Sequence, residues 1–390
     1  MFLAFFFCSS LGSLAQGDFF LEPEAMIGVN SPNWSRFPED RSRTVFALGV
    51  VKYFSDSASH WQSYYNFPSL SFSFFYSDLG SPVLGKEIGV IPQLTINFSK
   101  ERKLKSFYGR VGLGMSYATN PFDSLSNPGN EILGARWNWI FQFFVYRTLL
   151  ANANWHLKVG LGGLHTSNSH TELPNFGLNS GMISLSAQYF PKGLNYANFH
   201  NWKFEPNRQR IYFVQVYPGI GIHELGGTRR PINGPNKIIP NITVAGGVIF
   251  KQHLKVKVGL SYRYYDSFRD EIVKDQVEPY LQSPVWNASQ IHLIFGAEYL
   301  LGHIGMELES GITLFKPYFD QWFRTREEAE NDFALFQNKT FPNRIGANIY
   351  LLNTNKSPEH NVFVGLHVNA NWGTADFMGY TFGYVRRFRN

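Results

Sequence analysis

The stretch Leu254–Tyr264 reads LKVKVGLSYRY, and its residue types change strictly with position. Every even-numbered residue is leucine, valine or tyrosine, whereas every odd-numbered residue is lysine, glycine, serine or arginine. In an extended chain, successive side chains point to opposite faces, so a period of two separates an apolar face from a polar one. The stretch therefore predicts a β-strand with one apolar face and one polar face.

The same period of two recurs over residues 88–98, 107–117, 304–312 and 362–372. Each run has about ten residues, which is long enough for a tilted strand to cross a bilayer. The composition agrees, because aromatic residues make up 17% of the chain and charged residues only 16%, a balance that favours strands. Beyond the N-terminus, no apolar run reaches the roughly 18 residues of a helical membrane span.

The pattern predicts about sixteen strands in all. They cover residues 19–30, 43–54, 67–77, 87–98, 105–118, 136–150, 154–167, 178–190, 209–224, 239–251, 254–266, 290–301, 303–314, 343–353, 360–371 and 376–388. Many connections on one side are short, namely 151–153, 252–253 and 302. Those on the other side are mostly longer, namely 120–134, 225–236, 267–289 and 316–342. An even strand number with alternating short turns and long loops is typical of a bacterial outer-membrane barrel with its long loops outside the cell.

The sequence thus predicts an all-β protein, an antiparallel transmembrane barrel of the outer membrane. Backbone groups in hydrocarbon must pair internally, so a sheet can span a membrane only if it closes. A secreted soluble sandwich would also alternate, but the connection lengths favour the barrel. One barrel is favoured, in which residues 191–390 add further strands to the half formed by residues 16–190. Two tandem eight-stranded barrels, with a seam at residues 191–209, are the alternative.

Residues 1–15 are expected to form a secretory signal peptide, because an apolar run ends in the triplet Ser13-Leu14-Ala15. The only cysteine, Cys8, lies inside this segment, so the mature chain is expected to have neither a thiol nor a disulfide. The formal net charge of +6 is dispersed along the chain, which argues against a nucleic-acid partner and suits anionic lipid headgroups. Membrane lipids are the expected partners, and the oligomeric state is left open.

Reactive side chains gather where two neighbouring predicted strands, 154–167 and 178–190, approach the external rim. Counted by twos, the apolar face of the first strand continues into His165 and Ser167, and that of the second extends back to Asn179. His165 can take the proton of the Ser167 hydroxyl, and the Asn179 oxygen can fix the tautomer of the imidazole. Asn168 can offer an N–H to a developing oxyanion. The predicted site is therefore catalytic and faces the lipid.

A His-x-Ser pair at a membrane rim also has a purely structural interpretation, because polar groups at headgroup depth cost little. The asparagine on the same face of the adjacent strand favours the catalytic interpretation. A metal site is not expected, since His165 and His170 lack a convincing third ligand. The chemistry predicted from these residues is that of a serine hydrolase.

The sequence His165-Thr-Ser-Asn168 is followed by Pro174-Asn-x-Gly-x-Asn179. Together these motifs resemble the signature of PagL-type lipid A 3-O-deacylases and the related acyloxyacyl hydrolases. Residues 65–68, 81–85 and 117–121 look like the longer versions of that family found in Bacteroidetes-like bacteria. The resemblance covers about residues 20–190. It implies an outer-membrane serine esterase that removes an ester-linked acyl chain from lipid A, the lipid anchor of lipopolysaccharide.

Two features depart from that family. Its members carry a catalytic glutamate where this chain has Asn179, and their barrels have about half as many strands as are predicted here. Outer-membrane phospholipase A also combines a His-x-Ser pair with an asparagine at a similar separation, which keeps phospholipid open as a substrate, with Ca²⁺ as the cofactor. No cofactor is expected for a lipid A deacylase. A non-enzymatic, porin-like barrel is the alternative from another class of protein.

Overall fold

The computed structural model describes residues 19–32, 37–53, 62, 64–98, 106–190, 210–224, 226–229, 232–326 and 332–388, so the expected signal peptide at residues 1–15 lies outside the described residues. The strands of the first half are β1 (Phe19–Ser31), β2 (Ser42–Tyr53), β3 (Ser69–Asp78), β4 (Lys86–Asn97), β5 (Phe107–Ala118), β6 (Trp137–Ala151), β7 (Trp155–Ser167) and β8 (Leu178–Tyr189). Those of the second half are β9 (Arg210–Glu224), β10 (Asn236–Phe250), β11 (Leu254–Tyr264), β12 (Ser289–Leu301), β13 (Ile304–Phe315), β14 (Pro342–Tyr350), β15 (His360–Asn371) and β16 (Thr374–Phe388). The helices are α4 (Asp266–Lys274), α5 (Pro284–Asn287), α6 (Phe319–Arg326) and α7 (Asp332–Thr340), with 3-10 turns η2 (Tyr280–Gln282) and η3 (Thr354–Lys356).

The sixteen predicted strands are confirmed, and each strand end lies within three residues of its predicted position. The alternating pattern locates them well because each strand separates two different environments. In β8, for example, the exposure alternates residue by residue from Asn179, which is exposed, to the buried Ser186. Among the described residues, no helix is both long and apolar enough to cross a membrane.

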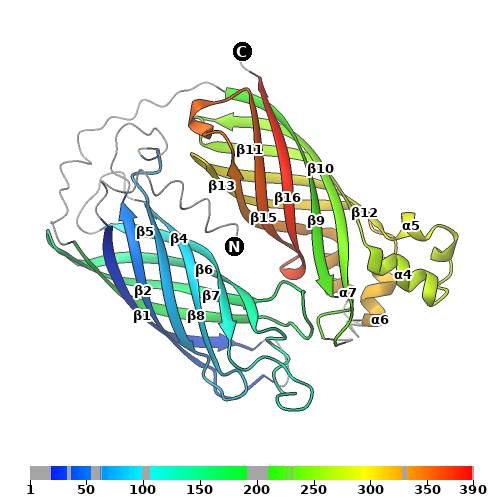
Figure 1. The fold of residues 1–390 in the computed structure, drawn as a ribbon, viewed down its shortest axis with the longest axis horizontal. Helices are drawn as coiled ribbons and strands as arrows, with labels where there is room; N and C mark the ends of the chain where they lie inside the picture. The colour runs from blue at the N-terminus through cyan, green and yellow to red at the C-terminus, as the bar shows by residue number, and fades with distance from the viewer. Residues whose placement is uncertain are drawn as a thin grey trace.

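The sixteen strands close as two separate eight-stranded barrels (Figure 1). β8 pairs with β1 to close the first barrel, and β16 pairs with β9 to close the second. The tandem arrangement left open by the sequence is therefore the observed one. The favoured arrangement, in which residues 191–390 extend the first barrel, is wrong, because β8 uses its free edge to pair with β1 instead of with β9.

The interior of the first barrel is packed with paired charges. The guanidinium of Arg110 lies between the carboxylates of Glu22, at 2.5 Å, and Glu24, at 2.9 Å. The hydroxyl of Tyr146 donates to Glu24 at 2.5 Å, and Lys158 reaches Glu22 at 2.8 Å. All of these side chains are buried. Eight-stranded barrels leave just enough interior space for side chains, so this barrel has a solid polar core.

The second barrel is filled in the same way. Lys255 bonds Glu298 at 2.9 Å, and Lys257 bonds Glu307 at 2.7 Å, with all four side chains almost completely buried. Arg344 lies 3.7 Å from Glu307, so the carboxylate is shared by two cations. A polar interior of paired charges explains why the odd-numbered lysines of β11 alternate with apolar residues.

The outer walls carry the apolar half of the alternating pattern. Large hydrophobic side chains on the outside are strongly exposed, as for Ile27 at 62% and Leu308 at 58%. Such a surface is stable only against hydrocarbon, so each closed barrel is built to span a membrane. The long connections of both barrels lie at the same end of the molecule. In the second barrel these connections contain the helices α4 to α7 (Figure 1).

The two barrels also touch at the opposite end, where the turns are short. The hydroxyl of Tyr65 donates to the carbonyl oxygen of His253 at 2.9 Å. Tyr65 packs in one apolar cluster with Leu94 of the first barrel and Leu301 of the second. The barrels are therefore neighbours along their walls, with their loop ends pointing the same way.

Candidate active site

Two predicted site residues meet on the outer wall of the first barrel. The register of β7 and β8 places His165 directly opposite Asn179. The imidazole Nδ1 lies 2.7 Å from the side-chain oxygen of Asn179. When Nδ1–H donates to this oxygen, the other ring nitrogen, Nε2, has a free lone pair and can accept a proton. His165 is partly exposed and Asn179 is exposed, so the pair is accessible from outside the barrel.

Ser167 occupies the last position of β7, two residues beyond His165, and its side chain is buried. Its hydroxyl oxygen lies 2.9 Å from Nδ2 and 3.2 Å from Oδ1 of Asn175, and it accepts the backbone N–H of Ser169 at 3.2 Å. Within the described residues, the hydroxyl has no hydrogen bond to His165. Catalytic hydrogen bonds are often long in unliganded enzymes and tighten when substrate binds. The resting hydroxyl is thus held by Asn175.

Gly177 shows that His165 and Ser167 border the same small space. A Cβ placed on Gly177 would lie 3.0 Å from Cε1 of His165 and 3.4 Å from Cβ of Ser167. The residue also has a φ of +69°, in the left-handed region that favours glycine. Both the close approach and the turn therefore require glycine here, and the loop after β7 folds back against both side chains.

The side chain of Asn168 is bonded within its own loop. Its amide nitrogen donates to the carbonyl oxygen of Glu172 at 2.6 Å, and its amide oxygen accepts the backbone N–H of Thr171 at 3.2 Å. These bonds tie down the loop of residues 168–177. The backbone N–H of Asn168 points to Oδ1 of Asn175 at 3.3 Å, so this N–H is the group of Asn168 that faces the site.

The sequence analysis missed a role for Asn175. The residue lies in the loop between β7 and β8, where a period of two gives no information on direction. Its position inside the motif Pro174-Asn-x-Gly-x-Asn179 was the one available signal. The structure brings four residues together, because Asn175 joins Ser167 while Asn179 joins His165.

The outer wall has a gap directly beside the His165–Asn179 pair. The next outward-facing pair on β7 and β8 consists of two glycines, Gly163 opposite Gly181. A Cβ added to Gly181 would meet no atom within 4 Å. The side chains that face outward around this gap are apolar, namely Val29, Phe143, Leu161 and Ile183. We call this gap the glycine notch; it opens on the apolar wall next to the imidazole.

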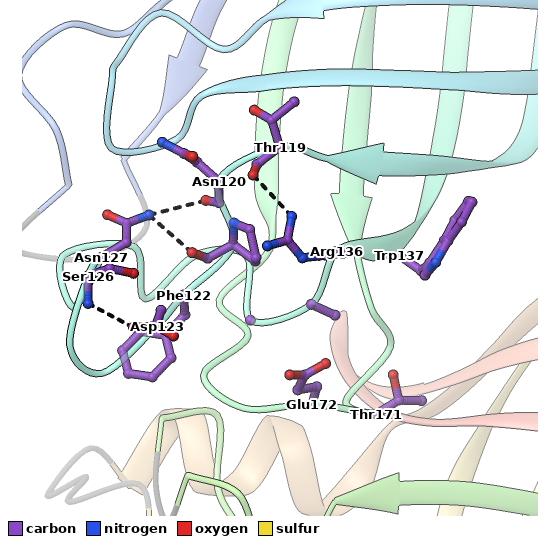
Figure 2. A pocket seen from close by; sticks show the side chains of 13 residues that line it. Thr119, Asn120, Phe122, Asp123, Ser126, Asn127, Arg136, Trp137, Thr171 and Glu172 are labelled. Carbon is purple, nitrogen blue, oxygen red and sulfur yellow. Dashed lines mark hydrogen bonds between the residues drawn. The ribbon is translucent and has the colours of Figure 1, made fainter.

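A polar pocket of about 510 Å³ lies between the loop that follows β5 and the loop that follows β7 (Figure 2). The loop between β5 and β6 forms most of it, and Thr171 and Glu172 of the loop after β7 complete it. Figure 2 shows the guanidinium of Arg136 bonded to the Thr119 carbonyl, at 3.4 Å, and Trp137 at one side. Partial burial raises the pKa of the Glu172 carboxyl above its usual value. The lining has amides, hydroxyls, an indole, one cation and the two carboxylates of Asp123 and Glu172, which are groups that suit the hydroxyls of a sugar.

Metal ligands do not gather in the part of the chain that the structure describes, where no group of three or more His, Cys, Asp or Glu could hold an ion. The groups that the site offers for chemistry are the serine, the histidine and the asparagines. An apolar outer wall, a closed barrel and this set at the lipid-facing rim define an outer-membrane barrel protein with a hydrolase-like site.

Comparison with known families finds a match for this barrel. Residues 50–188, which span most of the first barrel, match the model of the family described as lipid A 3-O-deacylase (PagL), so this part of the chain is similar to that family. The resemblance in the sequence motifs is thereby confirmed. The matching family is described as deacylases of lipid A, so the first barrel is similar in sequence to enzymes that act on that lipid.

Two of the solved structures that match this chain are distant in sequence. The crystal structure of the outer membrane enzyme PagL is 17% identical, with 42% of this chain and 97% of that chain covered and a TM-score of 0.32. An outer membrane channel from Pseudomonas putida F1 is 7% identical, with 95% and 96% covered and a TM-score of 0.21. No curated protein matches the sequence.

Proposed function

We propose that this protein is a serine esterase that removes an ester-linked acyl chain from lipid A in the outer membrane. Ser167 is the nucleophile, His165 is the general base and then the general acid, and Asn179 orients the imidazole. The observation that carries the proposal is the 2.7 Å contact between His165 and Asn179, on the outer wall next to Ser167. A Ser–His pair with a third group that orients the base is the arrangement that activates a serine.

The reaction proceeds in two halves. His165 Nε2 accepts the proton of Ser167 while the serine oxygen attacks the ester carbonyl carbon, and the carbonyl oxygen becomes an oxyanion. The oxyanion collapses, the C–O bond to the sugar breaks, and His165 returns its proton to the leaving sugar oxygen. Water then attacks the acyl-enzyme, again with His165 as base, and the fatty acid leaves.

Two N–H groups are available for the oxyanion. Nδ2 of Asn175 lies 2.9 Å from the serine oxygen, and the backbone N–H of Asn168 faces the same amide. Donors that point to where negative charge develops stabilise the transition state, and these two would turn from Ser167 and from the Asn175 oxygen toward the substrate carbonyl oxygen. Asn168 thus contributes through its backbone, whereas Asn175 contributes a side-chain donor.

The substrate is expected to lie along the outside of the barrel, with each part against a surface of matching polarity. The glycine notch offers an apolar gap beside His165 for the first carbons of an acyl chain. The polar pocket lined by Arg136 and Trp137 offers a site for the sugar. The ester that joins sugar to acyl chain would then lie between them, at Ser167.

Phospholipase A activity is the second candidate, and the observation that favours it is Asn179 as the partner of His165. A neutral orienting residue distinguishes this chain from the glutamate expected of PagL-type enzymes. A porin-like function is disfavoured, since buried ion pairs fill both barrels.

The purified protein in detergent micelles is expected to release fatty acid from lipid A faster than from phosphatidylethanolamine. The physical reason is the pocket, which offers more polar groups than a small zwitterionic headgroup can use. Mass spectrometry of both lipids, incubated separately with the protein in the presence of Ca²⁺ or of EDTA, measures the preference. Release from phosphatidylethanolamine alone, dependent on Ca²⁺, would establish the phospholipase instead.

Filling the glycine notch is expected to weaken catalysis without unfolding the barrel. In Gly181→Leu the new side chain occupies open space, so it blocks the acyl chain at little cost to stability. A few methylene groups in an apolar site change kcat/KM by about 10- to 200-fold, and we expect about a tenfold loss for lipid A.

The matched control is Gly246→Leu, which places the same side chain on the outward-facing side of β10 in the second barrel, where a Cβ makes only ordinary contacts. It should keep the wild-type kcat/KM. Equal activity of the Gly181→Leu and wild-type proteins would show that the acyl chain lies elsewhere.

A further inference from the structure

The loop that follows β7 is bonded to the second barrel. The backbone N–H of Glu224, the last residue of β9, donates to the carbonyl oxygen of His170 at 2.8 Å. Its carboxylate accepts the backbone N–H of Leu173 at 2.5 Å and, through its other oxygen, the backbone N–H of Gly234. Glu224 is buried and belongs to the second barrel. It therefore bonds the loop of residues 168–177, which we call the catalytic loop, at two positions and its own loop at one.

Further hydrogen bonds from the second barrel involve Asn175, the residue whose side chain contacts Ser167. The backbone N–H of Asn175 donates to the carbonyl oxygen of Thr228 at 2.9 Å, and Nε2 of His170 lies 3.1 Å from the carbonyl oxygen of Gly226. The side chain of Asn175 contacts the hydroxyl of Ser167. A single residue thus connects the backbone of the second barrel to the serine oxygen of the first.

A salt bridge next to these hydrogen bonds also joins the two barrels. Arg229 of the second barrel meets the carboxylate of Glu131 with N–O distances of 3.0 and 3.1 Å, a bidentate geometry. The carbonyl oxygen of Glu131 accepts the backbone N–H of Phe176, and that of Ile132 accepts the backbone N–H of Gly177. The second barrel therefore also holds the β5–β6 loop that supports the far side of residues 175–177.

We propose that the second barrel positions the active site of the first, with Glu224 and Arg229 as positioning residues. This inference rests on the proposed function, in which Ser167 is the nucleophile. Without Glu224 the backbone N–H of Leu173 loses its acceptor, the loop shifts, and the amide of Asn175 no longer fixes the serine oxygen. Small misplacements of reacting groups cost catalytic rate even when the chemical groups are intact.

The contact between the barrels at their short-turn end serves as the comparison for the contacts at the loop end. The hydroxyl of Tyr65 bonds the carbonyl oxygen of His253 at the short-turn end, remote from the catalytic loop. If the barrels only packed together for stability, losing either contact should affect activity in the same way. If the second barrel positions the loop, only the loop-end contacts should affect the nucleophile.

The experiment compares Glu224→Ala, Glu224→Gln and Tyr65→Phe in the full chain, each checked for folding by its heat-modifiable migration on gels. We measure kcat and KM for lipid A, the labelling rate of Ser167 by a fluorophosphonate, and hydrogen exchange of residues 168–177. Glu224→Ala should lower kcat and the labelling rate about 10- to 100-fold, with KM little changed and faster exchange. Glu224→Gln, which keeps one acceptor oxygen, should fall in between, and Tyr65→Phe should behave as wild type.

A charge swap provides the rescue. Glu131→Arg and Arg229→Glu should each lower kcat, whereas the double variant should recover most of it, because the ion pair forms again in reverse. Folded Glu224→Ala protein with wild-type kcat and labelling rate would overturn the positioning role alone. A wild-type protein with no esterase activity and an unreactive Ser167 would overturn the proposed function, and this inference with it.

Discussion

Replacing Ser167 with alanine is expected to stop the release of fatty acid from lipid A. The change removes the proposed nucleophile, and it leaves the His165–Asn179 contact intact. In serine hydrolases, loss of the nucleophile lowers kcat by about 10⁴-fold or more, because the remaining groups cannot replace covalent catalysis. Mass spectrometry of lipid A from cells that express each form measures the acylation pattern directly.

The control for this variant is Ser124→Ala, which removes an exposed hydroxyl from the β5–β6 loop. Both proteins should reach the membrane in equal amounts, since the Ser167 hydroxyl contacts only Asn175 and the Ser169 N–H among the described residues. An unchanged lipid A pattern in cells with Ser167→Ala, while wild type deacylates, would assign the reaction to another nucleophile.

The strands could be predicted from sequence because each lies between hydrocarbon and a polar core. In β11, the lysines at 255 and 257 are needed to neutralise Glu298 and Glu307 inside the barrel, and the residues between them face outward. This two-sided requirement sets the period, and the period sets the strand limits. The alternating pattern depends only on the residues of the strand itself, so each strand can be predicted separately from the others.

Closure could not be predicted in the same way. Both one wide barrel and two small ones satisfy an alternating pattern and an even strand number. The choice depends on whether the edge of β8 pairs with β1 or with β9, and these partners are equally alternating in sequence. Interior volume decides it: Arg110, Glu24 and Tyr146 fill an eight-stranded barrel completely, whereas a wide barrel would leave them in water.

The site was predicted as far as it lies on strands. His165 and Asn179 are on opposed positions of β7 and β8, and counting by twos is enough to place both on the outer wall. Asn175 and Glu224 were not predicted as site residues, because Asn175 lies in a loop and Glu224 belongs to the other barrel. Contacts between segments far apart in sequence leave no periodic trace in either one.

Changing Asn175 to aspartate is expected to lower kcat by about 10²- to 10³-fold with little effect on KM. The two side chains have the same shape, so the loop can keep its fold. The carboxylate, however, has no N–H to donate where Nδ2 now lies 2.9 Å from the serine oxygen. It also places a negative charge beside the position where the oxyanion develops, and loss of one such donor alone costs about 10²- to 10³-fold in kcat.

Asn168→Ala separates the two possible sources of the oxyanion donor. Its amide is already bonded to Glu172 and Thr171, so its removal should loosen the loop and cost less than about tenfold, while its backbone N–H stays in place. Steady-state kinetics with lipid A on both variants makes the comparison. If Asn168→Ala lost as much kcat as Asn175→Asp, the amide of Asn168 would be the donor in the reacting enzyme. The loop would then have to release that amide from Glu172 when substrate binds.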